Sequence, residues 1–448
     1  MSARRGVWQF PNFVRSWLAL AISTYGARIT RTALPIIAIT LLHQPESIIG
    51  VLVAGQLAPG IVLALFSGGF VDRTDKRLIL VWADIIRAAA IVSPTIAWMT
   101  GALTVAHLFV VGAIVGAASA MFHITDTAYL PTLVGTELVG DGNAVIEATE
   151  GVAEIVGPAS AGALIAMLGA PLAVAIDAVT YLWSALFLVR IKPPFAEPPR
   201  AQPPVKARVS LREDLAIGMR ALFGNAIVRP ITIAYMLWSL WGGFFMTLYA
   251  PFLLRDLHLG ETWFGVIVAM GGVGALFGAV FSRASVKRFG LGNTIIVSSA
   301  LSLAAGLFVP AARGSSVMVI AFLVAHQILA DGFSVAFVVQ ETTLRQTVIP
   351  TEILGRANAA FHVCTQVPLP IGALVGGALA SALGTRTALW IGITIGLLPP
   401  LLMWPLRRVR EIPPTSDSVA VRCPTTRTDR PPTRCVERRT RRRSRRCA

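Results

Sequence analysis

The chain has 448 residues, of which 55% are hydrophobic and only 14% are charged, and its formal net charge is +16. A soluble protein of this length carries nearer a quarter charged residues, so the composition excludes an ordinary soluble globular protein. Apolar runs of about twenty residues recur from end to end, and each is long enough to cross a bilayer. The sequence therefore predicts an all-α integral membrane protein.

The positive charge is concentrated in the last part of the chain. Residues 406–448 hold fourteen arginines against four acidic residues and have almost no apolar content. Such a segment cannot bury a core, so we expect a disordered basic tail in the cytoplasm. We expect no nucleic-acid partner. Attraction of the tail to anionic membrane lipid, at about 1 kcal/mol per basic residue near the surface, is the alternative to a tail without a specific role.

Catalytic and metal-binding patterns are missing from the sequence. Of the four cysteines, Cys364 lies inside an apolar run, and the other three recur in the basic tail without a Cys-x-x-Cys pair. No Walker loop appears, and the glycines around Gly271 lie inside an apolar run rather than after a strand. We therefore expect no metal, no cofactor and no enzymatic activity.

Twelve membrane-spanning helices are predicted from the apolar runs. With twelve spans, the basic residues of the external loops are only Arg255, Arg313 and Arg386, whereas the cytoplasmic segments hold most of the Lys and Arg. The positive-inside rule then places both termini in the cytoplasm. The predicted spans lie near residues 13–42, 47–70, 78–99, 104–127, 143–167, 170–190, 227–253, 262–282, 292–312, 316–339, 358–383 and 386–405.

A long proline-rich break separates the sixth span from the seventh. Six prolines between residues 193 and 204 favour an extended stretch of chain. A helix is expected from Ser210, as N-cap, to Phe223, and its apolar face is expected to lie on the membrane surface. We predict four parts: an N-terminal six-helix half over 1–191, a cytoplasmic connector over 192–225, a C-terminal six-helix half over 226–405, and the tail over 406–448.

A densely charged turn, GGFVDRTDKR, joins the second and third spans over residues 68–77. A bilayer does not accept so many charges at depth, so the turn lies at an interface, and its basic surplus places it on the cytoplasmic side. The charge alone fits a stop-transfer anchor that only fixes topology. Its charged residues are Asp72, Arg73, Asp75, Lys76 and Arg77.

The spacing Gly-x-x-x-Asp-Arg-x-x-[Lys/Arg]-[Lys/Arg] in this turn resembles the signature loop of the major facilitator superfamily. Asp75 stands where the general pattern has a glycine, which resembles the transmembrane secretion effector branch, with enterobactin-exporter-like and macrolide-efflux-like members. The segments that begin at Thr343 and Pro368 also resemble this branch. The resemblance implies twelve transmembrane helices in two six-helix halves. The motif is carried by Gly68, Asp72, Arg73, Lys76 and Arg77.

The resemblance implies that the turn is a conformational latch. Asp72 would lie near a helix N-terminus, and Arg73 or Arg77 would pair with a carboxylate and so hold one conformation. The carboxylate expected for this pair is Asp126, at the end of the fourth span. Asp84, in the third span, is expected to belong to the same latch.

The fifth span contains Gly157-Pro158 and Gly162, which resemble the Gly-Pro motif of antiporter helices in this superfamily. Gly157-Pro158 is expected to break the helical hydrogen-bond ladder and to let a neighbouring helix pack closely. An ordinary packing kink is the alternative, because Gly and Pro are common in membrane helices.

Charged residues inside the spans mark a candidate pathway for substrate and protons. Glu150 and Glu154 share one face of the fifth span with Glu147, and Glu154 is expected near the midplane. Arg28 and Arg31 share a face of the first span at similar depth, so an arginine–Glu154 pair is expected.

Two further polar residues, His326 and Asp331, lie in the tenth span. Histidine titrates near neutral pH, which suits a coupling group, although a buried histidine is as often a structural donor. Asp177, in the sixth span, is expected to have a structural hydrogen-bonding role.

These features predict a proton-coupled secondary-active exporter, an efflux antiporter of the drug or siderophore type, which works by alternating access. The expected partners are a small amphipathic substrate such as an antibiotic, dye or siderophore, together with protons and membrane lipid. The expected location is the bacterial inner membrane, as a multi-pass monomer that would confer multidrug resistance or export siderophores. An importer or facilitator on the same fold, or a membrane sensor or scaffold that does not transport, remains an alternative.

Overall fold

The structure is a computed structural model that describes residues 6–66, 70–71, 74–192 and 211–409. Every regular element in these ranges is a helix, and they contain no β-strand. All of the described residues belong to one compact unit, which ends at Pro413. Most of the predicted tail lies outside the described residues. Its first residues do not: the helical turn η4 (Trp404–Arg408) continues the fold, and the Val409 carbonyl accepts from Gly292 N at 2.8 Å.

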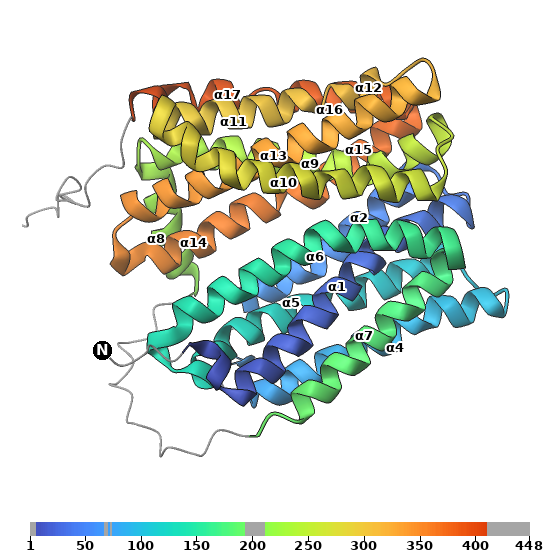
Figure 1. Cartoon of the computed structure of the whole chain (residues 1–448), viewed down its shortest axis with the longest axis horizontal. Helices are drawn as coiled ribbons and strands as arrows, with labels where there is room; N and C mark the ends of the chain where they lie inside the picture. The colour runs from blue at the N-terminus through green and yellow to red at the C-terminus, as the bar shows by residue number, and fades with distance from the viewer. Residues whose placement is uncertain (1–5, 67–69, 72–73, 193–210, 410–448) are drawn as a thin grey trace, which may run out of the picture. The chain divides into compact units, whose positions relative to one another are not determined.

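The helices pack mainly within two sets along the chain (Figure 1). The short helical turns η1 (Val7–Gln9) and η2 (Thr136–Leu138) precede α1 and α6. We call the first group the N-terminal helix set: α1 (Pro11–Thr40), α2 (Glu46–Phe66), α4 (Lys76–Met99), α5 (Val105–Val134), α6 (Val139–Leu168) and α7 (Ala170–Val189). We call the second group the C-terminal helix set: α9 (Val228–Pro251) with its π-turn η3 (Phe252–Asp256), α10 (Glu261–Phe289), α11 (Leu291–Ala305), α12 (Phe308–Ala311), α13 (Ser316–Val348), α14 (Thr351–Gln366), α15 (Pro368–Leu383), α16 (Thr385–Gly396) and α17 (Pro399–Leu402).

Ten helical segments in the described part of the chain are long and apolar enough to cross a membrane. The helices α1 and α6 are not among these ten. Each has 30 residues, which is about 45 Å at 1.5 Å per residue. Each predicted span coincides with one helix or with two consecutive helices. The all-helical membrane fold is therefore confirmed, while the count of twelve spans and the boundaries of the halves stay predictions.

Helix α13 continues beyond the predicted tenth span. The span was predicted near residues 316–339, and α13 runs through a polar stretch to Val348. The polar side chains find partners inside the protein. Gln340 Nε2 donates to Ser282 Oγ at 2.6 Å, and Arg345 Nε donates to Glu341 Oε1 at 2.7 Å. Because these groups are paired, the helix can continue through them.

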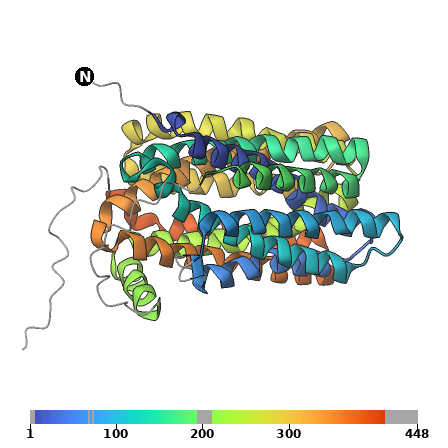
Figure 2. The ribbon, with the colours of Figure 1, turned by 90° about the horizontal axis from the view of Figure 1, so that it is seen from below.

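The connector helix α8 (Leu211–Gly224) lies within one residue of its predicted range, although Ser210 is outside the described residues. Its apolar face does not lie on lipid as predicted. Leu222 is fully buried against α14, where Met219 meets Cys364, and Arg356 Nε lies 2.7 Å from Asp214 Oδ1. Figure 2 shows α8 beside α14 from below. The apolar stripe therefore docks the connector on the C-terminal helix set.

The two helix sets meet through glycines, chiefly where α2 packs on α15 and α6 packs on α10. A Cβ added at Gly162 of α6 would lie 2.2 Å from the Cα of Gly265 in α10. A Cβ added at Gly377 of α15 would lie 2.5 Å from the Glu46 carbonyl oxygen in α2. The glycine-rich segment after Pro368 therefore packs closely on α2, because only glycine lets backbones approach this closely.

A short repeat relates the two helix sets, and the sequence analysis missed it. Leu42-His43-x-x-Glu46-Ser47 precedes and opens α2, and Leu257-His258-x-x-Glu261-Thr262 precedes and opens α10. Both histidines adopt the same left-handed backbone conformation, with φ of 51°. The same turn therefore occurs at corresponding places in the two sets, as an internal repeat requires.

Candidate functional site

A cavity of about 570 Å³ lies between the helix sets, within the range of small-molecule sites. Most of its wall comes from α1, α2, α4, α5 and α6, and the C-terminal helix set contributes His362, Gln366 and Leu369. Apolar side chains such as Ile61 and Val115 share the wall with charged ones. The charged or titratable lining residues are Arg28, Arg31, Arg87, His123, Glu150, Tyr181 and His362.

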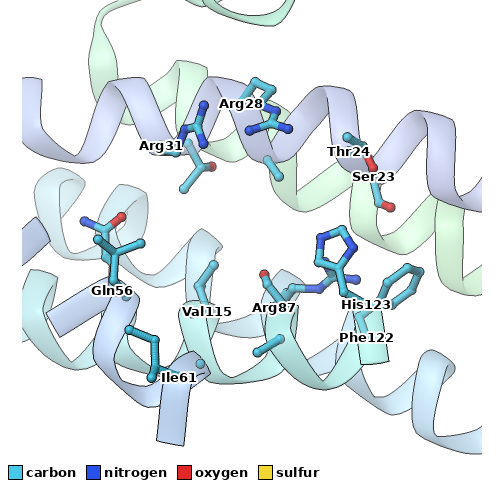
Figure 3. A pocket seen from close by; sticks show the side chains of 18 of the residues that line it. Ser23, Thr24, Arg28, Arg31, Gln56, Ile61, Arg87, Val115, Phe122 and His123 are labelled. Atoms are coloured by element: carbon cyan, nitrogen blue, oxygen red, sulfur yellow. The ribbon is translucent and has the colours of Figure 1, made fainter. Parts of the chain in front are cut away.

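Arg28 and Arg31 lie on the stretch of α1 that faces the cavity, and Figure 3 shows them across from Gln56, Arg87 and His123. A close approach of α6 positions this stretch, because a Cβ added at Gly157 would lie 2.4 Å from Arg28 Cβ. The predicted close packing at Gly157 is therefore present. The helix α6 runs as one element through Leu168, and the expected break at Gly157-Pro158 stays a prediction, because the Pro158 side chain lies outside the described residues.

The predicted pair between an arginine of α1 and Glu154 cannot be placed. Glu154 and Pro158 are part of α6, but their side chains lie outside the described residues. Glu150, one turn earlier on the same helix, does line the cavity together with Arg28 and Arg31. The structure thus brings together three of the six residues predicted for the pathway.

The buried wall of the cavity contains an ion pair between Arg87 and Asp84 of α4. The Arg87 guanidinium lies 4.4 Å from the ring centroids of both Phe122 and Tyr181. Asp84 and Arg87 are almost completely buried. Asp84 was predicted to belong to the cytoplasmic latch. It pairs with Arg87, a cation that lines the cavity, and its membership of the latch stays a prediction.

His123 of α5 is a cavity residue that the sequence analysis missed. Its Nδ1 lies 3.8 Å from Glu150 Oε1, and the two side chains are 55% and 33% exposed. The only signal in the sequence was a lone histidine within an apolar run, and the same description fits His326. Which of the two faces a carboxylate depends on how the helices are rotated and packed.

His326 and Asp331 lie away from this cavity, on α13. His326 is buried, its Nδ1 lies 2.9 Å from the Ala305 carbonyl oxygen, and its ring packs near Phe245. Asp331 accepts from Gln327 Nε2 at 3.1 Å and sits against Gly271 of α10. These contacts give His326 a structural role and leave Asp331 outside the described cavity.

Asp177 of α7 has the structural role that was predicted. Its carboxylate accepts hydrogen bonds from the hydroxyl of Thr30 in α1 and from that of Thr180, the latter at 2.8 Å. The same carboxylate packs where Gly26 lacks a side chain, 2.2 Å from an added Cβ. Asp177 therefore ties α1 to α7 beside the cavity.

The signature turn lies only partly within the structure, because Gly68, Asp72 and Arg73 are outside the described residues. Asp75 caps α4 by accepting from Arg77 N at 2.9 Å, and half-buried Lys76 opens the helix. The Arg77 side chain donates to the carbonyls of Leu188, at 3.1 Å, and Val189.

Arg77 therefore does not pair with Asp126, and that prediction was wrong. The carbonyls at the C-terminal end of α7 carry the partial negative charge of the helix dipole and attract the arginine instead. Asp126 is buried and accepts from Ser16 Oγ at 3.5 Å. The expected pairing of Asp126 with Arg73 lies outside the described residues.

Two helix sets around a charged central cavity, in a membrane protein with an internal repeat, define the architecture of a secondary transporter. The chain belongs to the Major Facilitator Superfamily, whose family model matches residues 16–368. The family predicted from the signature turn is therefore confirmed, and the protein is a multi-pass membrane transporter of a class that binds small-molecule substrates.

Several known proteins are similar to this chain. It is 30% identical over 310 residues to the putative bacilysin exporter BacE of Bacillus subtilis, a match that covers 67% of this chain and 74% of BacE. It is 27% identical over 298 residues to the enterobactin exporter EntS of Salmonella choleraesuis strain SC-B67, covering 64% and 67% of the two chains. The inward-facing structure of a bacterial homologue of the iron transporter ferroportin matches with a TM-score of 0.69 at 17% identity, over 88% of this chain and 98% of that one.

Proposed function

We propose that the protein is a proton-coupled exporter that moves a small amphipathic molecule out of the cell across the bacterial inner membrane. The observation that carries the proposal is the cavity, which combines apolar side chains with arginines and a carboxylate inside membrane-spanning helices. Charges at this depth are costly and are kept where they face water, substrate or ions. Such a wall suits a molecule that has both an apolar body and a charged or polar group.

Alternating access is supported by where the helix sets touch. Along α1, Arg28 lines the cavity and Ile39, eleven residues or about 16 Å further on, contacts the C-terminal helix set. The same order holds on α6, where Glu150 lines the cavity and Gly162 meets α10. The cavity therefore lies on one side, along the helix axes, of the contacts between the two helix sets. With both termini in the cytoplasm, as the distribution of Lys and Arg predicts, that side is the cytoplasmic one.

Arg255 supplies the polar part of the proposed external closure. Its NH1 lies 3.1 Å from Glu46 Oε1, and its NH2 donates to the Ile39 carbonyl at 2.9 Å. A further bond joins Ser47 N to Ser381 Oγ at 2.9 Å. These bonds link the two helix sets and would have to break for the cavity to open outward.

The direction of transport and the coupling to protons are inferred from different observations. The similar proteins BacE and EntS are both named as exporters. The cavity holds titratable groups, His123 and Glu150, that can exchange protons with water. Import on the same fold would use the same cavity, so direction must be measured.

Cells that produce the protein are expected to accumulate less ethidium than cells with an empty vector. Collapsing the proton gradient with an uncoupler is expected to raise accumulation to the vector level, because export of the dye would lose its driving force. Fluorescence of the cell-associated dye measures both states. Higher accumulation than the vector before uncoupling would indicate import, and low accumulation that survives uncoupling would exclude proton coupling.

A further inference from the structure

The histidines in the membrane-spanning helices differ in what their rings contact. His107 lies 2.9 Å from the Ser93 hydroxyl, and His326 is buried against a backbone carbonyl. His362 lines the cavity, but no carboxylate of the described residues lies within ion-pair distance of it. His123 combines an exposed ring, a position in the cavity wall and a carboxylate at 3.8 Å.

We infer that His123 and Glu150 together form the proton-binding site that couples the proton gradient to the conformational change. This inference rests on the proposed function, and it assigns the site to a pair on α5 and α6 rather than to His326. The separation of 3.8 Å can be bridged by one water molecule or closed by a small side-chain movement. Both groups face the cavity, so water can deliver and remove the proton when the cavity is open.

The charges around the pair make proton binding there depend on the helix arrangement. The guanidinium groups on neighbouring helices disfavour a positive charge on the His123 ring, whereas the Glu150 carboxylate favours it. The charged and titratable groups that line the cavity with His123 are Arg28 and Arg31 from α1, Arg87 with its buried partner Asp84 from α4, Glu150 from α6, Tyr181 from α7 and His362 from α14, together with neutral Gln56 from α2. Asp126, on the same helix as His123, accepts from Ser16.

The proton step can be written from these groups. In the state open to the outside, a proton from external water binds an imidazole nitrogen of His123, and the imidazolium is held beside the Glu150 carboxylate. In the state open to the cytoplasm, the same proton returns to water and His123 is neutral. Movement of the C-terminal helix set, which contributes part of the cavity wall, changes how far water reaches the pair, so the proton is bound with different affinity in the two states.

The test measures the conformational equilibrium without a substrate. The full chain, in a background without native cysteines, carries spin labels at Ala102→Cys, in the connection before α5, and at Ser316→Cys, the first residue of α13, and both positions are exposed. In lipid nanodiscs, double electron–electron resonance gives the ratio of short to long distances between about pH 4 and pH 8, so that histidines which titrate below the ordinary value are included. We expect that ratio to change by about tenfold, within the usual range of coupling between two sites.

His123→Gln and Glu150→Gln are expected to reduce the change to less than about twofold, and Glu150→Asp to preserve it, because the aspartate keeps the negative charge. His107→Gln is the matched control, since His107 is a histidine of the same helix α5 that lies against the Ser93 hydroxyl and does not line the cavity, and it is expected to behave like the parent protein. A tenfold change that survives His123→Gln, or that is lost in His107→Gln as well, would overturn the inference. A parent protein without pH dependence would instead contradict the proposed proton coupling itself.

Discussion

Replacing Arg87 by leucine is expected to destabilise the protein by about 3–5 kcal/mol, because the substitution leaves Asp84 as a buried carboxylate without its cation. The guanidinium also fills the space between Phe122 and Tyr181, so packing is lost together with charge. Thermal unfolding of the purified protein in detergent and the amount of protein in the membrane fraction would both show the effect.

The double variant Arg87→Leu with Asp84→Leu separates charge from packing. If the unpaired carboxylate causes most of the loss, removing it is expected to recover most of the unfolding temperature, because a buried ion pair can often be replaced by apolar residues at little cost. A double variant as unstable as Arg87→Leu alone would mean that the contacts of the guanidinium with the two rings dominate.

Replacing Gly162 by alanine is expected to prevent the helix sets from closing where α6 meets α10. The added methyl group would lie 2.2 Å from the Cα of Gly265, and a backbone atom cannot move away without separating the two helices. Overpacking of this kind costs about 1–3 kcal/mol, which would shift a two-state equilibrium by about fivefold to a hundredfold toward the outward-open state.

Labelling measures that shift from outside the cell. A single cysteine at Ser119, in the cavity wall, is expected to react faster with a membrane-impermeant maleimide in Gly162→Ala than in the parent protein. Gly151→Ala is the matched control, because Gly151 lies on the same helix with no atom within 4 Å of an added Cβ. Equal rates in the two alanine variants would show that the Gly162–Gly265 contact does not control access.

The sequence predicted the fold well, because the forces that form these helices act locally. Apolar runs and basic loops identified the spans, and the apolar stripe of α8 was located within one residue. The partner of that stripe was not predicted, since lipid and the surface of α14 are both apolar. The continuation of α13 beyond the predicted span was not predicted for a related reason. The polar side chains of Gln340 and Glu341 are typical of loops, and their partners Ser282 and Arg345 are known only from the structure.

The candidate site was predicted only in part. Arg28, Arg31 and Glu150 were conspicuous because they are charged residues in apolar runs, and all three line the cavity. His123 and His326 could not be ranked from the sequence, because one faces a carboxylate and the other a backbone carbonyl. Such differences depend on tertiary packing.

The packing partners of the glycines could not be predicted from the sequence either. Gly162 was predicted as part of an antiporter motif, and its backbone contact with Gly265 lies 103 positions away in the chain, between the two helix sets. No local pattern identifies that partner. Helix kinks and close approaches look alike in sequence, and the close approach of Gly157 to Arg28 was established only by the structure.

Proton release driven by substrate in everted membrane vesicles tests the central claim most directly. Vesicles that contain the protein are energised until their interior is acidic, ethidium is then added, and a fluorescent amine reports the gradient. Proton-coupled export predicts that the dye enters the vesicles while the gradient partly collapses, and that vesicles without the protein show neither change. Entry of the dye at the same rate with no loss of the gradient would contradict proton coupling and identify a facilitator.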